Sequence, residues 1–179
     1  MKNNASKGAG ISVFEMCVYA MLATLMLLSK LLLEALPNVH LLGTLTMVYA
    51  LVLRWRALIP IYLYVFLNGL VAGFNLWWLP YLYIWTILFL VTMALPKRMP
   101  RRVAFFVYPI VCSLHGFAYG TLYAPAQALM FGFNLEQTVA WIVAGFPFDL
   151  IHGVSNFAVG FLVLPLSGAL GKLMHSHRK

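Results

Sequence analysis

Three polar side chains near the end of the chain repeat at helical spacing. Asp149, His152 and Asn156 lie at positions i, i+3 and i+7, so they fall within one stripe of a helix. Asp149 also falls in the first turn of a helix expected to start at Pro147, where the helix dipole favours an anion. The stripe either lines a cavity open to the outside or forms an internal Asp–His pair that fixes neighbouring helices.

A second polar stripe precedes the first in the chain. His115, Tyr119 and Tyr123 are spaced four residues apart, and Gly116 and Gly120 lie beside them. Two glycines at this spacing predict a close helix–helix contact. The imidazole and phenol groups suit either hydrogen bonding inside the helix bundle or contact with a ligand.

An aromatic segment follows two asparagines that share a helix face. Asn68 and Asn75 are seven residues apart, and five aromatic residues come next within nine positions: Trp77, Trp78, Tyr81, Tyr83 and Trp85. Amphipathic rings are typical of a membrane interface. Their density also suits stacking on a flat ligand.

These side chains sit in a chain that is too apolar for an ordinary soluble domain. Of its 179 residues, 63% are hydrophobic and 9% are charged, and the mean hydropathy is +0.90. No Asp, Glu, Lys or Arg occurs between Ala57 and Pro96. As a helix this run would reach about 60 Å, twice the roughly 30 Å hydrocarbon core of a bilayer. The run must therefore cross a membrane and return.

The apolar stretches predict an all-α integral membrane protein with one domain. We expect six transmembrane helices, at residues 11–36, 39–53, 58–76, 79–95, 103–124 and 147–170. The last helix is expected to start after a break at Gly145 to Pro147. An alternative starts it at Gln137 and kinks it at Pro147.

The basic residues predict the orientation of these helices. They form four clusters between the apolar stretches: Lys2 and Lys7; Arg54 and Arg56; Lys97, Arg98, Arg101 and Arg102; Lys172, Arg178 and Lys179. With six crossings all four clusters and both termini fall on one side, which the positive-inside rule makes cytoplasmic. This pattern explains the net charge of +8 better than nucleic-acid binding does.

One pair of opposite charges lies inside the first apolar stretch. Lys30 and Glu34 are spaced i, i+4, which predicts an ion pair on the helix surface. Either residue could instead cap a ligand pocket, because both are costly to leave in lipid.

The motifs of several enzyme classes are missing from the sequence. It lacks the phosphate-binding loop of nucleotide hydrolases, the Gly-x-Ser-x-Gly of hydrolases and the His-Glu-x-x-His of zinc proteases. A small membrane enzyme using Asp149, His152 and His115 remains an alternative. The same three residues have no fixed metal-ligand spacing, so we expect no metal or other cofactor.

Two segments resemble one family of membrane proteins. They are "LLSKLLLEALPNVHLLGTLTMVYALVLRWRALIPIYLYVFLNGLVAGFNLWWLPYLYIW" (residues 27–85) and "AGFPFDLIHGVSNFAVGF" (residues 144–161). With the chain between them they look like the S-component of an energy-coupling factor (ECF) transporter, the subunit that captures a vitamin in the bacterial cell membrane. The resemblance implies ATP-driven uptake without an ATPase of the chain's own.

The resemblance also implies partners. An S-component docks on a transmembrane T-component that carries two cytoplasmic ATPase subunits, and the whole S-component is thought to topple in the membrane. In the family the first helix makes this contact through an Ala-x-x-x-Ala seam. The matching positions here look like Ala20 and Thr24, with Ala23 beside them.

The substrate expected from the resemblance is cobalamin or a related corrinoid. Aromatic residues and glycines with few charges would suit such a bulky ligand. Riboflavin, a queuosine precursor or another flat ring compound could use the same surfaces. A structural or assembly subunit without a ligand is a further alternative.

Overall fold

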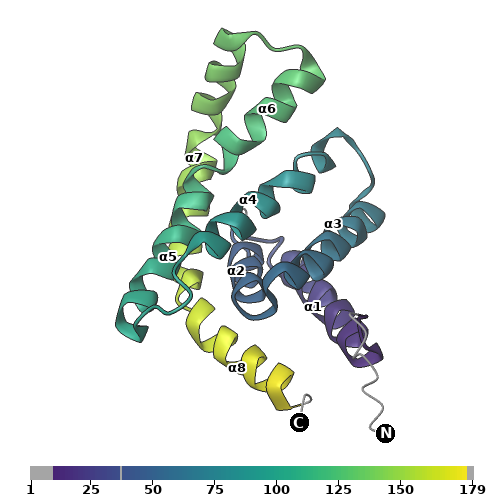
Figure 1. Ribbon diagram of the computed structural model, residues 1–179. Coiled ribbons are helices and arrows are strands. Elements are labelled where there is room, and N and C mark those ends of the chain that lie inside the picture. The colour runs from purple at the N-terminus through teal and green to yellow at the C-terminus, as the bar shows by residue number, and fades with distance from the viewer. Residues whose placement is uncertain (1–9, 37, 177–179) are drawn as a thin grey trace, which may run out of the picture.

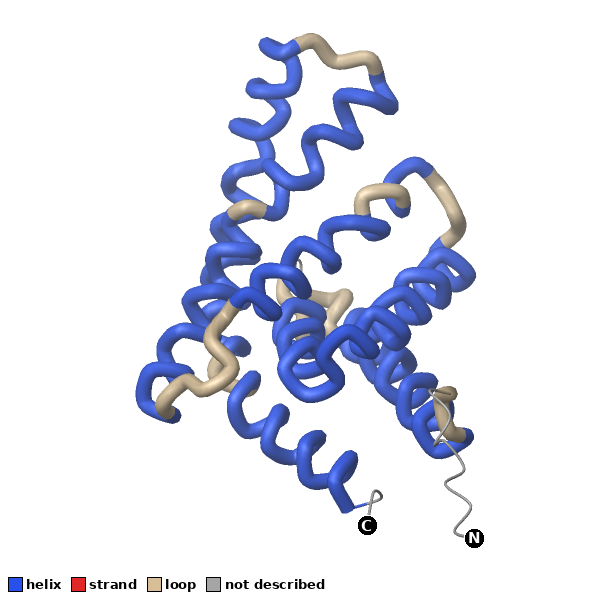
Figure 2. The backbone as a smooth tube through the Cα atoms, viewed as in Figure 1, coloured by secondary structure: helices blue, strands red, loops and turns tan. Residues whose placement is uncertain are grey.

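The computed structural model describes residues 10–36 and 38–176, and within them every regular element is a helix (Figures 1 and 2). The long helices are α1 (Val13–Leu32), α2 (Leu42–Leu53), α3 (Leu58–Ala72), α4 (Tyr81–Ala94), α5 (Arg101–Phe117), α6 (Tyr119–Phe131), α7 (Leu135–Gly160) and α8 (Val163–Ser176). Short 3-10 helices η1 (Arg54–Ala57) and η2 (Leu76–Trp78) lie before α3 and α4. Lys2, Lys7, Pro37, Arg178 and Lys179 lie outside the described residues.

The surface of the molecule is rich in large apolar side chains. Leu129, Leu135 and Val13 expose 87%, 81% and 72% of their surface. Among the described residues, five continuous helical segments are long and apolar enough to cross a bilayer: Val13–Leu32, Leu42–Ala72, Leu76–Ala94, Arg101–Phe131 and Leu135–Gly160. Because the second of these contains a turn, five or six crossings fit the chain. The architecture is that of a multi-pass membrane protein.

Side-chain caps fix where two of the helices begin. The Ser12 hydroxyl accepts a hydrogen bond from the Glu15 amide, and the Glu15 carboxylate accepts one from the Ser12 amide, which starts α1. Asn134 and Gln137 make the same reciprocal pair at the start of α7. Gly132 adopts a left-handed conformation (φ 68°) that ends α6. α6 and α7 therefore form a tight helical hairpin (Figure 1).

α2 is the central helix of the bundle. Ten of its twelve residues are buried, and it packs against α4 and α8. Arg54 then takes a positive φ of 57°, which breaks the helix before η1 and turns the chain into α3. Arg56 in η1 forms an ion pair with Glu15 of α1, with Nη1 and Oε1 2.6 Å apart.

Small residues bring α5 and α7 into close contact. A Cβ added at Gly116 would lie 2.8 Å from the His152 carbonyl oxygen and 2.9 Å from the Gly153 Cα. A Cβ at Gly160 would lie 2.6 Å from the Pro109 Cα. The Ser113 hydroxyl donates a hydrogen bond of 2.8 Å to the Gly153 carbonyl. The close helix contact predicted at Gly116 is confirmed.

Several expected boundaries differ from the structure around prolines. The break expected at Gly145 to Pro147 is absent, because α7 runs from Leu135 to Gly160 with Pro147 inside it. Pro125 likewise lies inside α6 and does not end a helix. Proline removes one backbone hydrogen bond, and helices of membrane proteins tolerate this loss. Both prolines are exposed on the helix surface, where the ring meets no tight packing.

Other expected boundaries differ at the helix ends. The segment expected at 103–124 contains a bend at Ala118, between α5 and α6. The segment expected at 147–170 is divided at Phe161, where α7 ends, and α8 follows. α1, α3 and α4 end at Leu32, Ala72 and Ala94, a few residues or less before the limits expected from hydropathy.

Different segments of the chain lie at the two ends of the molecule. α1 begins and α8 ends at the lower side of Figure 1, where the connection between α4 and α5 also lies. That connection holds Lys97 and Arg98. The α6–α7 hairpin extends toward the opposite side (Figure 1). The cytoplasmic assignment of the basic end stays a prediction.

Candidate ligand-binding site

Two neighbouring hollows lie where the end of α1 and the α1–α2 connection meet α4, α6 and α7. The first has a volume of about 250 Å³ and the second about 320 Å³. Asn38, Tyr119 and His152 line both of them. The hollows therefore adjoin at these three residues, and we call them the Lys30 hollow and the Asp149 hollow after one charged residue in each.

A pair of histidines forms part of this shared boundary. The Nε2 atoms of His40 and His152 lie 2.6 Å apart, so one nitrogen donates a proton and the other accepts it. The Tyr119 ring lies 4.7 Å from the His152 ring, and the Trp85 ring lies 5.9 Å from the His40 ring. Burial of His40 and the neighbouring His152 lower the pKa of His40 to about 3. His40 is therefore neutral at physiological pH.

Asp149 is held in the second hollow by the backbone of α6. Its side chain is buried, and its Oδ1 accepts a hydrogen bond of 2.9 Å from the Gly120 amide. A Cβ at position 120 would collide with this carboxylate, so glycine is needed for the approach. Among the described contacts no hydrogen bond joins Asp149 to His152. The expected Asp–His pair is therefore replaced by Asp149–Gly120 and His152–His40.

Aromatic rings form one wall of the Asp149 hollow. Tyr123 and Trp141 stack with their ring centres 6.0 Å apart and an interplanar angle of 19°, and both line the hollow. The Tyr119 ring lies 6.1 Å from Tyr123. The Tyr123 hydroxyl donates to the Trp77 carbonyl at 2.7 Å. η2 thereby helps to fix the stacked pair.

Lys30 and Glu34 both line the first hollow and do not pair with each other. Within the described residues, the structure contains one ion pair, between Arg56 and Glu15. The expected i, i+4 pair fails because α1 ends at Leu32, so Glu34 follows the helix in a turn. Glu34 is exposed and Lys30 half-buried. The alternative interpretation, that Lys30 or Glu34 caps a ligand pocket, fits this geometry.

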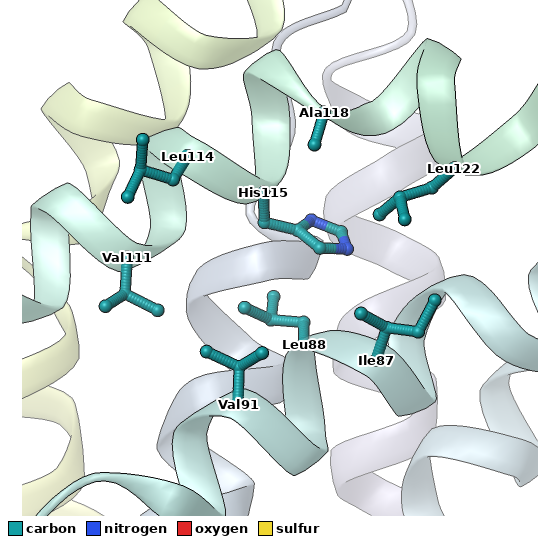
Figure 3. Close-up of a pocket in the computed structure, with 8 residues that line it drawn as sticks. All are labelled: Ile87, Leu88, Val91, Val111, Leu114, His115, Ala118 and Leu122. Atoms are coloured by element: carbon teal, nitrogen blue, oxygen red, sulfur yellow. The ribbon is translucent and has the colours of Figure 1, made fainter.

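His115 belongs to a different, apolar hollow. This space of about 240 Å³ lies between α4, α5 and α6, and His115 is its one polar lining residue (Figure 3). The His115 Nε2 contacts the Ile84 carbonyl at 3.2 Å. Its imidazole lies among Ala118, Leu122 and Ile87 in Figure 3. His115 therefore contacts the back of the Trp85 and Tyr119 rings, with centres 5.9 and 6.3 Å away, and lines neither polar hollow.

Asn156 lies in the same stripe as Asp149 but packs between helices. It is 1% exposed, and its Nδ2 donates to the Cys112 carbonyl at 3.4 Å. The amide also lies against Gly43 of α2 and Gly116 of α5. Asn156 therefore joins α7 to α5 and α2 and lines neither polar hollow.

The aromatic segment divides between the site and the neighbouring helix. Tyr81 lines the Lys30 hollow, and Trp85 packs against it with ring centres 5.9 Å apart. Trp77 contacts the site through the Tyr123 hydroxyl. Trp78 instead donates from Nε1 to the Val65 carbonyl of α3 at 2.8 Å. Asn75 is exposed in the connection after α3, so neither residue lines the polar hollows.

Asn68 is buried in α3 without a hydrogen-bond partner. Over residues 10–36 and 38–176, no partner is found for the Asn68 amide, the Tyr64 hydroxyl or the Trp85 Nε1. Tyr64 and Asn68 lie one turn apart on the buried face of α3, and Tyr64 lies within electrostatic range of Tyr81. Unpaired polar atoms are costly in an apolar interior. Their presence on the α3 and α4 faces near Tyr81 indicates a polar region that extends inward from the Lys30 hollow.

Four lining residues were not among the candidates from the sequence. His40 and Asn38 follow the expected end of the first helix, and Gln127 and Trp141 occupy a segment that was expected to contain no membrane helix. A polar Asn-x-His in a short connection between apolar stretches is a usable signal for His40. Gln127 and Trp141 become visible only once α6 and α7 are known to pair.

The predicted partner-coupling residues on α1 point in two directions. Ala20 and Thr24 line an apolar surface hollow of about 480 Å³ together with Met21, Leu25 and Leu28. Ala23 is fully buried in the core. It shares the buried face of α1 with Tyr19 and Met26, which pack against the rest of the bundle.

The arrangement as a whole suits binding of a small polar compound. Across the part of the chain that the structure describes, no three His, Cys, Asp or Glu side chains gather into a metal-binding group, so Asp149, His152 and His115 do not converge. The polar hollows instead offer one ammonium, two carboxylates, two imidazoles and aromatic faces. Comparison with protein-family models, curated proteins and solved structures finds no match.

Proposed function

We propose that this chain is a substrate-capturing membrane subunit, the S-component of an ECF-type transporter for a vitamin or related ring compound. One observation carries the proposal. An otherwise apolar helical molecule contains two adjoining polar hollows, with Lys30 in one and Asp149 in the other. Charged groups inside apolar helices are costly and mark ligand or ion sites. The resemblance of residues 27–85 and 144–161 to S-components supports the same function.

The dimensions of the hollows favour a small ligand over a corrinoid. Each hollow lies near the low end of the roughly 300–1,000 Å³ range of ligand sites, at about 250 and 320 Å³. The glycines that could have made room for a macrocycle are covered by protein, since the Phe74 ring covers Gly69 and the Phe117 ring covers Gly153. We therefore propose a compound of one to a few rings ahead of cobalamin.

The proposal includes partners and a location. The subunit would lie in the bacterial plasma membrane with both termini in the cytoplasm, and would dock on a T-component with two ATPase subunits. The apolar groove along Ala20, Thr24 and Leu28 supports a helix-packing partner at α1. The chain would bind its substrate without hydrolysing ATP.

A membrane enzyme is less well supported by the geometry. The candidate catalytic groups would have to act on one bond, yet His115 lies in the apolar hollow and Asp149 and His152 lie in the polar ones. Asp149 and His152 hydrogen-bond to Gly120 and His40, and not to each other. Their separation gives no nucleophile–base pair of the usual geometry.

The direct test is mass spectrometry of small molecules released from the protein purified alone in nanodiscs without ATP. We expect one ring compound at near-stoichiometric amount, and loss of most of it from His152→Ala. The matched control is His175→Ala, at an exposed position of α8, which should retain it. A vitamin panel that gives neither a released compound nor a thermal shift would contradict the proposal.

A further inference from the structure

Each polar hollow is lined by a charged side chain that is buried or half-buried, and these two side chains have opposite charges. Lys30 lines one and Asp149 lines the other, and the ring pair of Tyr119 and His152 lies at their boundary. We infer that the ligand is a zwitterionic ring compound, with a carboxylate at Lys30, a protonated nitrogen at Asp149 and a flat ring between them. This inference rests on the proposed function and specifies the chemistry of its substrate.

Asp149 has no positively charged partner among the described residues. Its carboxylate is 5% exposed and accepts one hydrogen bond, from the Gly120 amide. An ionised carboxylate has about four acceptor positions, and an unpaired buried charge is strongly unfavourable. Among the described residues no Lys, Arg or His forms an ion pair with it. A protonated nitrogen in the hollow would satisfy the remaining positions.

Lys30 provides the complementary group in the other hollow. It is half-buried near the end of α1 and makes no ion pair within the described residues. Glu34 lines the same hollow but is exposed, so water screens its charge more strongly. A ligand group of single negative charge fits between them, whereas Glu34 would repel a doubly charged phosphate. These charges select a carboxylate.

The boundary between the hollows suits an uncharged flat ring. The Tyr119 and His152 rings lie 4.7 Å apart at 41°, and Tyr123 stacks on Trp141 next to them. His40 is neutral at neutral pH, so it adds no charge beside the ring. A ring lying along these faces would extend into both hollows, because Asn38, Tyr119 and His152 line both of them.

Three probes of matched size separate the two charges. Isothermal titration of the nanodisc protein at pH 7 would use 4-(aminomethyl)benzoate, 4-methylbenzoate and 4-methylbenzylamine. We expect the zwitterion to bind roughly tenfold or more tightly than either singly charged probe, because each charge makes a charge-assisted hydrogen bond. Lys30→Met should remove the advantage over 4-methylbenzylamine, and Asp149→Asn the advantage over 4-methylbenzoate.

Two control substitutions keep the test interpretable if a variant folds poorly. Lys97→Met and Glu136→Gln remove the same charges at exposed positions away from the hollows and should leave all three affinities unchanged. Equal binding of the three probes, or a zwitterion advantage that survives both site substitutions, would overturn the inference. A vitamin that binds the wild type and is insensitive to both substitutions would overturn it while leaving the proposed function intact.

Discussion

The Nε2 atoms of His40 and His152 lie 2.6 Å apart, although the two residues are 112 positions apart in the chain. The contact joins the α1–α2 connection to the middle of α7. It requires one imidazole to donate and the other to accept, so a second proton on the pair would break it. The contact between His40 and His152 therefore depends on the protonation of both side chains.

Acid should destabilise the protein through His40. Its pKa is about 3 when folded, below the ordinary value of 6.5, because burial desolvates the imidazolium and because His152, His115 and Lys30 repel positive charge. The unfolded chain therefore binds more protons between pH 6.5 and 3. Stability contributed by neutral His40 is complete above pH 6.5 and falls below it, by up to about 1.4 kcal/mol per pH unit. Thermal unfolding in detergent across pH 4–8 measures this slope.

His40→Gln is the control for acid sensitivity. Glutamine does not titrate in this range, so the variant should show a shallower loss of melting temperature below pH 6.5. An equal slope in the two proteins would assign the acid sensitivity to other groups.

Gly120→Ala should weaken ligand binding. The new methyl group would collide with the Asp149 carboxylate and displace it from the Gly120 amide. We expect an affinity loss of about tenfold, the effect of one hydrogen bond to a charged group, together with some loss of stability from overpacking. Gly171→Ala in α8, where a Cβ meets nothing within 4 Å, should leave binding unchanged. Equal affinities in the two variants would contradict the placement of Asp149.

Asn156→Ala should lower stability and leave affinity unchanged. Its amide donates to the Cys112 carbonyl in the α5–α7 contact and lies outside the polar hollows. Removing a buried hydrogen-bonding group costs about 1–3 kcal/mol. Chemical denaturation and probe titration of the same preparation measure the two effects. A large affinity loss without a stability change would return Asn156 to the binding site.

Ala20→Leu should abolish uptake and preserve substrate binding. A larger side chain would fill the groove along α1 that Ala20 and Thr24 line. Transport assays with the reconstituted ATPase module, beside ligand titration, measure the two functions. Ala23→Leu is the informative comparison, because Ala23 is fully buried and its enlargement should destabilise the fold by about 1–3 kcal/mol. Normal uptake by Ala20→Leu would place the partner surface elsewhere.

The helical class follows from composition and apolar runs and is confirmed, and the apolar helices of the structure fit a multi-pass membrane protein. The number of crossings and the cytoplasmic side stay predictions. Two of the boundary errors in the second half have the same cause. Proline was taken to end helices at Pro125 and Pro147, whereas both lie inside helices. Local propensity cannot reveal that the rest of α6 and α7 would pair as a hairpin.

The candidate site was partly predictable. Helical spacing put Asp149 and His152 in one stripe and Tyr119 in another, and the structure brings all three to the polar hollows. The same spacing included Asn156 and His115, which face a neighbouring helix and an apolar hollow. Helical spacing shows which residues share one stripe of a helix. It does not show which part of that stripe a neighbouring helix covers. His40 comes from a distant segment, so no periodic pattern could have joined it to His152.

The burial of α2 bears on how such a molecule could move. With ten of its twelve residues enclosed, this helix begins next to the histidine pair and ends at the Arg54 turn on the basic side. A helix that is packed along its whole length cannot slide or rotate unless its contacts with the neighbouring helices break. A displacement at one end of α2 would therefore tilt the whole helix together with the helices packed on it. It would not open a local flap.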